Sequence, residues 1–518
     1  MSSPPDIEVL VVGAGPVGCW VAAELCAAGV RVMIVEARES RAAWSRGFVV
    51  HPRTLEIFDS RGVAAPMLAA SRRVPTWHFA MGASRLDFTV LPTSFPHILL
   101  QPQAQTEELL EAHLNRCGGE VLRGRRVVDV RQEPDRVVAR VRHDGVEQEV
   151  HARYVVGCDG AHSSVRETAG IGFSGTPDTI VSPAALVELA DPPPPERYLQ
   201  GNERGLLFVI PLPDGRFVVS TIDHAVMTEL KKPWTAQMVR ESLIRISGTD
   251  YGIGEVERVS TLGNSTMQAD RYRDGRVLLA GDAAHVHFPM GGQGMNLGIH
   301  DAHNLAWRLI GAVKAERDGA ESDGTESDAA GAGAGTADST DGTGGTGSAA
   351  IAATVDALLD GYEAERRPAG ERVLEDVHAQ MGLVAATGAD GAALRARFEA
   401  LLAEHPSVNL QYARRLSGIA VRYGDGGEDA RIGARVPDLL LEQAGGPPVQ
   451  LYERLRELGP GRFVRLIVGE GDPGREADAA TVAASAVLGP DWAARDGWDI
   501  PGTVLIRPDG HVAEAGTW

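Results

Sequence analysis

The sequence predicts an α/β protein with several domains, and three observations support this prediction. The chain has 518 residues, which is more than a single hydrophobic core usually serves. Residues 7–36 follow the order strand, glycine turn, helix, strand, which is the pattern of a βαβ unit. Strand-like and helix-like segments alternate again after about residue 431 and indicate a separate small α/β domain.

The βαβ unit is built around "GAGPVG", which runs from Gly13 to Gly18. In a G-x-G-x-x-G turn, the first glycine permits the tight turn and the second lets a pyrophosphate approach the backbone. The third lets the helix pack closely on the strand. Gly13, Gly15 and Gly18 hold these positions, with Pro16 between them. The helix that follows would offer partial positive charge and N–H donors to phosphates, so this turn predicts a bound dinucleotide.

The second strand of the unit, "VRVMIV", ends at an acidic residue, Glu36. Gly29, just before this strand, stands where a helix C-terminus favours a left-handed residue. A carboxylate at position 36 can accept hydrogen bonds from ribose hydroxyls, although an acid at a strand end can also be simply solvated. An acid here favours an unphosphorylated ribose, so FAD or NAD fits better than NADP.

Two strand-rich regions, 74–100 and 176–268, interrupt the first domain. In "GLLFVIPLPDGRFVVSTID" the Pro-Asp-Gly sequence marks a hairpin turn. Residues 126–160 alternate apolar and polar side chains, as an antiparallel meander does. We therefore expect a β-sheet domain inserted into a discontinuous first domain, which comprises residues 1–73, 101–175 and 269–380.

A second motif, "CDGAHSSVRETAG", follows the apolar run "YVVG" and starts at Cys158. A strand again ends in a glycine-containing turn, and a helix is predicted to start near Ser163. Asp159 either caps this helix or belongs to a ligand site. Arg166 either pairs with Asp159 or faces a phosphate-bearing cofactor.

The third motif, "GDAAHVHFPMGGQGMNLGIHDAHNLAWRL", follows the apolar strand "VLLA". Asp282 stands between this strand and a helix that is predicted to begin around Gln293, so its carboxylate is expected at the rim of a cleft. Gly291, Gly292 and Gly294 let the backbone come within hydrogen-bonding distance of a flat or phosphorylated ligand.

The rest of the chain divides by composition. Residues 316–350 contain eight acidic residues and one basic residue among Gly, Ala, Ser and Thr, which predicts a disordered loop between two helices. A regulatory or partner-binding segment is the alternative. Residues 381–430 read as a helical connector, and residues 431–518 form the small C-terminal domain.

Charge and cysteine content exclude several classes of protein. The net charge of −20 disfavours nucleic acid as a partner, because phosphate backbones reward a basic surface. No run of about 18 apolar residues is present, and the N-terminal segment has no basic n-region, so we expect neither a membrane span nor a signal peptide. The four cysteines lack metal-binding and C-x-x-C spacing, which fits reduced thiols in the cytoplasm and no bound metal.

Taken together, in order and spacing, "GAGPVG", "CDGAHSSVR" and "GDAAHVHFPMGGQGMNLG" resemble the three signatures of the FAD-dependent aromatic hydroxylases. These are single-component flavoprotein monooxygenases of the para-hydroxybenzoate hydroxylase type. The resemblance covers about residues 7–380. It implies a Rossmann-like FAD-binding domain, with FAD held tightly but not covalently, and an inserted mixed-sheet substrate domain.

The resemblance also implies roles for single residues. Gly13, Gly15, Pro16, Gly18 and Glu36 would hold the ADP half of FAD, with the backbone of Val127 near the adenine. Arg46 and Gln103 match residues near the flavin and the ribityl chain; a surface arginine and a solvated strand end are the alternatives. Asp159 would serve FAD and the nicotinamide cofactor, and Asp282 the ribityl chain. The isoalloxazine ring would be bordered by Pro289 and the segment 291–296, including Gly292, Gly294, Met295 and Asn296.

By the same resemblance, NADPH or NADH docks transiently and reduces the flavin, which forms a C4a-hydroperoxide with O2 and hydroxylates a phenol-like ring. One dinucleotide motif in the chain agrees with a transient reductant. "LLFVIPL" and "WHFAMG" around Trp77 are expected to wall a dry substrate pocket. Baeyer–Villiger oxidation or epoxidation on the same fold is the first alternative, and a non-catalytic flavin-containing metabolite-binding protein is the second.

The C-terminal segments "RIGARVPDLLL" and "VLIRPDGHVAEAG" resemble the thioredoxin-like tail of hydroxylases that act on polyketides and related polycycles. No cysteine follows Cys158, so this domain is expected to have no dithiol chemistry and to serve structure or subunit contact, for example in a homodimer. The sequence thus predicts an FAD-dependent hydroxylase of an aromatic polyketide or a related polycyclic phenol.

Overall fold

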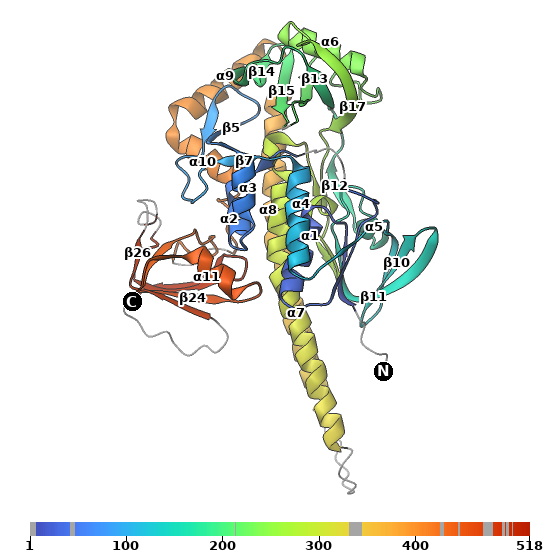
Figure 1. Cartoon of the computed structure of the whole chain (residues 1–518), viewed down its shortest axis with the longest axis vertical. Coiled ribbons are helices and arrows are strands. Elements are labelled where there is room, and N and C mark those ends of the chain that lie inside the picture. Colours follow the sequence, from blue (N-terminus) through green and yellow to red (C-terminus); the bar gives the residue numbers. More distant parts are fainter. Residues whose placement is uncertain are drawn as a thin grey trace.

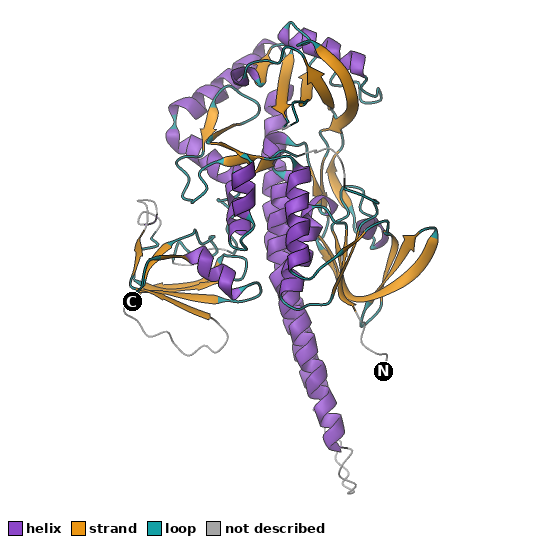
Figure 2. Cartoon of the chain, in the orientation of Figure 1, coloured by secondary structure: helices purple, strands orange, loops and turns teal. Residues whose placement is uncertain are grey.

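The computed structural model describes residues 7–41, 47–212, 214–330, 344–424, 429–443, 446–469, 480–488, 493, 497–499 and 501–517. Two long helices run through its centre, with a β-sheet domain at one end of them and further sheets on either side (Figure 1). Figure 2 shows strands gathered in three separate places around these helices, as an α/β protein of several domains requires.

The main sheet has eight strands and contains the predicted βαβ unit. Its order is β19-β20-β11-β1-β2-β8, with β10 and β9 continuing from β11. β1 pairs in parallel with both β2 and β11, and β11 pairs in parallel with β20. The predicted meander is confirmed, because β9, β10 and β11 pair antiparallel in sequence order. The strands are β1 (Ile7–Val12), β2 (Val32–Val35), β8 (Val121–Leu122), β9 (Arg126–Gln132), β10 (Val137–His143), β11 (Val146–Gly157), β19 (Arg273–Asp274) and β20 (Val277–Leu279).

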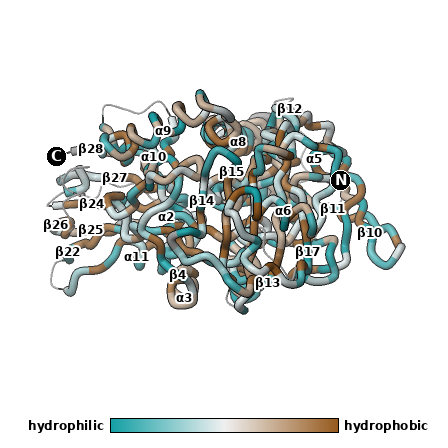
Figure 3. The backbone as a smooth tube through the Cα atoms, turned by 90° about the horizontal axis from the view of Figure 1, so that it is seen from above, coloured by the Kyte–Doolittle hydropathy of each residue, from teal (hydrophilic) through white to brown (hydrophobic). Residues whose placement is uncertain are grey.

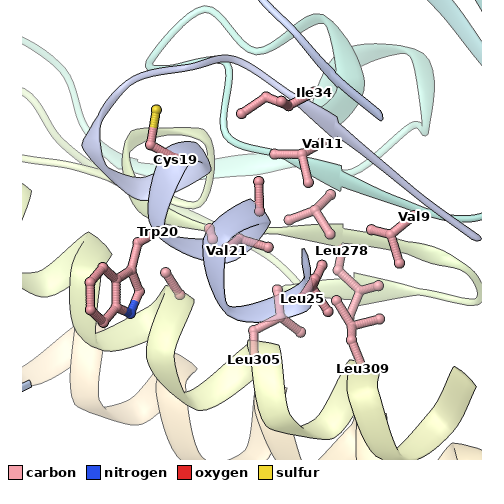
Figure 4. Packing of buried hydrophobic residues seen from close by; sticks show 14 of the residues in the cluster. Val9, Val11, Cys19, Trp20, Val21, Leu25, Ile34, Leu278, Leu305 and Leu309 are labelled. Carbon is pink, nitrogen blue, oxygen red and sulfur yellow. The ribbon is translucent and has the colours of Figure 1, made fainter. Parts of the chain in front are cut away.

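The core of the main domain lies between this sheet and the two long helices. Helix α1 (Pro16–Ala27) packs between the strands and helix α7 (Gly294–Ala330). Val21 and Leu25 of α1 are fully buried beside Leu305 and Leu309 of α7 (Figure 4). Gly29 ends the α1 segment with φ +75°, the left-handed conformation that the sequence predicts there. Hydrophobic stretches of the chain run through the middle of the body (Figure 3).

The prediction of a disordered loop over residues 316–350 is wrong at both ends. Helix α7 continues to Ala330, and helix α8 (Gly344–Ala385) covers residues 344–350, while residues 331–343 lie outside the described part of the chain. The composition misled because Ala and Glu are strong helix formers and the helices support each other. Glu316 accepts a hydrogen bond from Tyr154 (3.0 Å), and a Cβ on Gly319 would lie 2.3 Å from Ile351 Cδ1.

The second sheet forms a separate layer at one end of the long helices. Its five strands have the order β14-β15-β16-β13-β17, and all neighbouring pairs are antiparallel. The predicted hairpin is β15 and β16, and helix α6 packs on this sheet. The elements are β13 (Val181–Leu189), η1 (Pro195–Arg197), β14 (Leu199–Asn202), β15 (Gly205–Pro211), β16 (Phe217–Asp223), α6 (Ala236–Ser247) and β17 (Ile253–Gly263).

Smaller elements connect the two sheets. β3 (Val49–Val50), β7 (Ile98–Leu100) and β4 (Arg72–Val74) form one antiparallel sheet, β5 (Thr76–His78) and β6 (Arg85–Asp87) form another, and β12 (Phe173–Thr176), β18 (Thr266–Ala269) and β21 (His285–Val286) form a third. The helices here are α2 (Pro52–Asp59), α3 (Ala64–Ala70), α4 (Gln103–Arg116) and α5 (Ser164–Thr168). Helices α9 (Gly388–Glu404) and α10 (Pro406–Leu416) fall in the predicted helical connector and pack beside β6.

The C-terminal segment has a hydrophobic core of its own. Its larger sheet has the order β25-β24-β27-β28, with β24 parallel to β25 and antiparallel to β27. Such a mixed sheet agrees with the thioredoxin-like domain, which stays a prediction. The elements are β22 (Leu440–Glu442), β23 (Val449–Gln450), α11 (Leu451–Leu458), β24 (Val464–Val468), β25 (Ala480–Ala484), β26 (Ala486–Leu488), β27 (Gly502–Ile506) and β28 (Val512–Thr517). In the part of the chain that the structure describes, no helix has the length and hydropathy needed to cross a membrane.

Candidate active site

Three segments far apart in the sequence meet at one edge of the main sheet. β1, β11 and β20 are adjacent parallel strands, and Val12, Gly157 and Leu279 lie side by side at their carboxyl ends. The three glycine-containing motifs begin just beyond this row on the three strands. Ligands of open α/β sheets bind outside the carboxyl ends of the strands, so the topology brings the motifs together where a cofactor is expected.

The β1–α1 turn has one open glycine between two crowded ones. A Cβ on Gly13 (φ +99°) would lie 2.4 Å from the carbonyl oxygen of Cys158, and one on Gly18 would lie 1.9 Å from that of Gly13. A Cβ on Gly15 would meet no protein atom within 4 Å. Helix α1 begins at Pro16 with no side-chain cap and no acid in its first turn. The positive end of the helix therefore faces open space, which fits a pyrophosphate.

Glu36 lies directly behind this turn and is 6% exposed. Its carboxylate accepts hydrogen bonds from the Ala14 N–H (2.9 Å) and from the backbone and side chain of Arg38 (2.9 Å each). Burial acts to raise the pKa of Glu36, but these hydrogen bonds hold it below its ordinary value. A carboxylate has about four acceptor positions, so one remains for a ribose hydroxyl.

Asp159 caps helix α5, as the first of the two interpretations predicts. Its carboxylate accepts hydrogen bonds from the hydroxyls of Ser163 (2.5 Å) and Ser164 (3.0 Å) and from the Val165 N–H (3.2 Å). Ser163 is the N-cap residue, which confirms the predicted start of this helix. The side chain is partly exposed, so a role in cofactor binding stays a prediction for Asp159.

The Arg166 side chain hydrogen-bonds to backbone carbonyls and not to Asp159, the first of its two predicted partners, and its place facing a cofactor stays a prediction. Its guanidinium donates to the backbone carbonyls of Ala161 and Ala283 (3.0 Å each) and lies 3.9 Å above the ring of Phe173. Ala283 directly follows Asp282, so this buried arginine ties the second motif to the third.

Asp282 lies in a tight turn, η2 (Gly281–Ala283), and is exposed beyond the carboxyl end of β20; its place at the rim of a cofactor cleft stays a prediction. The turn packs against both helices of the site. A Cβ on Gly281 would lie 2.9 Å from Val17 of α1, and one on Gly298 of α7 would lie 3.0 Å from the Gly281 Cα. Only glycine permits this approach, which fixes where the Asp282 carboxylate emerges.

A buried charged network lies under this turn and was not predicted from the sequence. Asp301 accepts hydrogen bonds from Arg366 Nε (2.8 Å) and from the Gly281 N–H (3.2 Å), and it lies 2.6 Å from His285 Nε2. The side chains of Asp301, His285 and Arg366 are fully buried. Burial acts to raise the pKa of Asp301, but Arg366 and His285 hold it below its ordinary value. The signal was weak, because an acid on a helix gives no sign of a partner 65 residues away.

The glycine loop passes close to β3 before α7 begins. Gly291 and Gly292 have φ values of +71° and +74°, and a Cβ on Gly292 would lie 2.7 Å from Val49 Cβ. The Asn296 side chain donates to the carbonyls of Val49 (2.9 Å) and Gly292 (2.8 Å) and accepts from the His51 N–H (2.8 Å). The Asn296 side chain therefore holds the loop, and a contact between Asn296 and the cofactor stays a prediction.

Gly294 and Met295 are the first two residues of helix α7, so their backbone N–H groups lie in its first turn. Both residues are partly buried. These groups have no acceptor within a helix, which leaves them for a ligand. His287 lies close to this helix start, because a Cβ on Gly294 would lie 3.8 Å from its Nε2. Burial lowers the pKa of His287 to about 4, so this imidazole is neutral at pH 7.

Gln103, Val127 and Arg46 are the remaining predicted residues. Gln103 starts helix α4, where its backbone N–H donates to Gly47 (2.9 Å) and its side chain to Glu107 (2.8 Å). The carbonyl of Val127 in β9 accepts from Ser164 (3.0 Å), which places this strand beside the second motif. Arg46 lies outside the described residues.

A cavity of about 280 Å³ lies between the glycine loop and the second sheet. Pro289 and Gly292 border it on one side, next to Phe288. Its other walls contain both segments that the sequence predicts for a dry pocket, and most of the side chains are apolar or aromatic. They include Phe48, Val49, Trp77, His78, Met81, Leu100, Tyr198, Leu199, Phe208, Val209, Ile210, Pro211, Val218 and Leu262.

Known proteins of similar sequence and structure are found. The sequence profile of a family described as "FAD binding domain" matches residues 6–338. An uncharacterized aromatic compound monooxygenase of Bacillus subtilis is 37% identical over 98% of this chain and 94% of its own. A 12-dehydrotetracycline 5-monooxygenase/anhydrotetracycline 6-monooxygenase of Streptomyces rimosus is 33% identical over 98% of this chain and 94% of its own. The solved structure of an anhydrotetracycline hydroxylase from Streptomyces rimosus superposes with a TM-score of 0.81 at 33% identity, covering 98% of this chain and 95% of that one.

Proposed function

Because the chain belongs to the FAD-binding-domain family of aromatic monooxygenases, we propose that it hydroxylates an aromatic polyketide or a related polycyclic phenol, consuming NAD(P)H and O2. One observation carries the proposal. The loop predicted to border the flavin ring, from Pro289 to Gly292, is also one wall of an apolar cavity. A substrate held in this cavity would lie against the reactive part of the cofactor.

The residues present fit FAD, and their roles follow from their positions. Gly15 and the first turn of α1 would hold the pyrophosphate, and Glu36 a ribose hydroxyl. The exposed carboxylate of Asp282 would accept a hydrogen bond from the ribityl chain, and the first turn of α7 would face the ring. When bound, FAD supplies redox chemistry that activates oxygen, which no protein side chain can do.

The chain itself contributes orientation and the exclusion of water. The aromatic and aliphatic walls exclude water from the cavity, so that activated oxygen is used on the substrate and is not lost to solvent. Burial, with smaller contributions from Arg85 and His51, lowers the pKa of His78 to about 3, so this lining imidazole is neutral. The network of Asp301, His285 and Arg366 fixes the turn that presents Asp282.

The proposed reductant is NADPH or NADH, docking only for the reduction step. Within the described part of the chain, Gly13–Gly18 is the one G-x-G-x-x-G sequence that lies between a strand and the helix after it, and it is assigned to FAD. Asp159 and Arg46 are proposed to lie near the docked nicotinamide cofactor and the flavin, as the resemblance implies. The C-terminal domain is proposed to be thioredoxin-like in fold and structural in role, since it has no cysteine.

The proposal is tested by purifying the protein and measuring its flavin content, its NAD(P)H oxidation and its O2 uptake. We expect a yellow protein with about one FAD per chain, whose NAD(P)H oxidation accelerates when a polycyclic phenol is added. Isotopically labelled O2 should place one labelled oxygen on a ring carbon. A lactone product would instead indicate Baeyer–Villiger oxidation, and ligand binding without O2 uptake would indicate a non-catalytic binder.

The assignment of Asp282 has its own test. Asp282→Ala is expected to lower the FAD content after gel filtration, because a hydrogen bond from the ribityl chain to a carboxylate is lost. Glu149→Ala is the matched control, since Glu149 is an exposed acid on the far part of β11. Equal FAD content in both variants would contradict the assignment.

A further inference from the structure

The walls of the cavity have an unusual charge for this protein. The chain carries seventy acidic and fifty basic residues, yet no aspartate or glutamate is among the described residues that line the cavity. Two arginines, Arg72 and Arg85, do line it. The lining histidine, His78, is neutral, because burial and the charge of Arg85 lower its pKa to about 3. The two arginines are therefore the cations of this cavity wall.

Neither arginine is neutralised by an ion pair within the described part of the chain. Both arginines are exposed residues at the edge of the cavity, and no carboxylate oxygen of a described residue lies within 4 Å of either guanidinium. Arg85 donates to the carbonyl of Gly82 (3.2 Å). Burial lowers the pKa of Arg85, and Glu399 acts in the opposite direction, but Glu399 accepts the Ala83 N–H instead (3.2 Å).

Strand register places Arg72 on the same face of its sheet as Val49, which lies against the glycine loop. In the sheet β3-β7-β4, Val49 pairs with Leu100 and Leu100 pairs with Arg72, so the three side chains share one face. All three line the cavity, and a Cβ on Gly292 would lie 2.7 Å from Val49 Cβ. Adjacent strands are about 4.8 Å apart, so the Arg72 backbone lies roughly 10 Å across the cavity wall from β3.

The second cation lies on the aromatic side of the cavity. In the hairpin β5–β6, Arg85 pairs with His78, next to the pair of Trp77 and Leu86. Trp77 and His78 form edge contacts with Phe208 of β15, at ring centroid distances of 6.3 Å and 6.0 Å. Arg85 therefore stands beside a cluster of rings that suits a flat, apolar ligand.

We propose that the substrate carries a carboxylate, which Arg72 and Arg85 bind while the apolar walls hold its rings against the glycine loop. This inference rests on the proposed function and adds the charge of the substrate to it. An unpaired guanidinium at the edge of an apolar cavity binds an oxyanion through short, charge-assisted hydrogen bonds. A neutral polycycle would leave both guanidinium groups to solvent, with no gain in binding from their charge.

The phosphates of NAD(P)H are also oxyanions that an arginine can bind. The experiment must therefore distinguish binding of the substrate from binding of NAD(P)H. Two matched probes serve for the substrate: 4,5-dihydroxyanthraquinone-2-carboxylic acid and its neutral 2-methyl analogue. The FAD-loaded enzyme is titrated with each probe, and Kd is taken from the change in flavin absorbance. NADP⁺ is titrated in parallel. These are binding measurements and require no turnover.

We expect the acid to bind about tenfold or more tightly than the neutral probe, as one charge-assisted hydrogen bond allows. Arg72→Gln and Arg85→Gln should each remove most of this preference and leave the Kd of the neutral probe unchanged. Arg73→Gln is the matched control. Arg73 is the next residue on β4, pairs with Leu99 and does not line the cavity, so this variant should keep the full preference.

Two results would overturn the inference. Equal Kd values for the two probes in the unmodified enzyme would show that the cavity does not select an acid. Loss of NADP⁺ binding in Arg72→Gln and Arg85→Gln, with the acid preference intact, would assign the cations to the reductant. Either result is distinguishable from failure of the proposed function, because that failure appears as a purified protein without FAD.

Discussion

Substitution of two glycines in the β1–α1 turn, Gly15 and Gly18, should separate folding from cofactor binding. Gly15 has φ −72° and ψ −177°, which any residue adopts, and its Cβ would meet no protein atom within 4 Å. Gly15→Ala should therefore change the free energy of unfolding of the apoprotein by less than about 1 kcal/mol. The new methyl group would occupy the space proposed for the pyrophosphate. Loss of one charge-assisted hydrogen bond there costs about 1.5–3 kcal/mol, or roughly 10- to 100-fold in the Kd of FAD.

Two matched variants complete this experiment. In Gly18→Ala the Cβ would lie 1.9 Å from the carbonyl oxygen of Gly13, so the apoprotein itself should lose about 1–3 kcal/mol or more. Gly29→Ala places alanine at φ +75° in open space, which should cost about 1 kcal/mol of stability and leave the Kd of FAD unchanged. The assays are urea unfolding of the apoprotein and fluorescence titration with FAD. If Gly15→Ala binds FAD as tightly as the unmodified protein, the assignment of this turn to the pyrophosphate is wrong.

Three further predictions concern the buried charges. Asp301→Asn leaves the Arg366 cation buried without a counter-ion and should lower the free energy of unfolding in urea by about 3–5 kcal/mol. Asp376→Asn, in the more exposed pair with Arg415, should lower it by about 1 kcal/mol or less. Equal losses in the two variants would refute this contrast. Burial acts to raise the pKa of Glu24, but Arg61 and His303 lower it from 4.5 to about 2, so its stabilisation is complete above pH 4.5 and is lost as the pH falls toward 2. Unfolding free energies measured between pH 5 and pH 3 should fall less steeply in Glu24→Gln, and an unchanged slope would contradict the role of this carboxylate. Arg166→Met removes the hydrogen bonds to Ala161 and Ala283 that join two motifs, and should weaken FAD binding on the order of tenfold, whereas the same change at exposed Arg142 should leave the Kd unchanged.

Local features of the fold were predictable because a few neighbouring residues determine them. The glycine turn at Gly13, the left-handed Gly29, the helix start at Ser163 and the β15–β16 hairpin each depend on short-range geometry that the sequence displays directly. The convergence of three motifs followed from a second rule, that parallel strands present their carboxyl ends at one edge.

Side-chain partners across the fold were not predictable in the same way. Asn296 stands in a cofactor-binding pattern, yet its amide is used to join the glycine loop to β3, and only tertiary packing decides between these uses. Arg72 and Arg85 gave no sequence signal, because an arginine in a short strand is usually solvated. The acidic tract 316–350 misled for a related reason, since composition omits the support that one helix gives another.

The central claim is that three distant segments hold one FAD with its ring against an apolar cavity. A crystal structure of the purified protein with its bound flavin tests this claim most directly. We predict electron density for a pyrophosphate over Gly15, a ribityl chain beside Asp282 and an isoalloxazine ring against Gly292 and Pro289. Flavin density at a different edge of the sheet, away from these residues, would contradict the account.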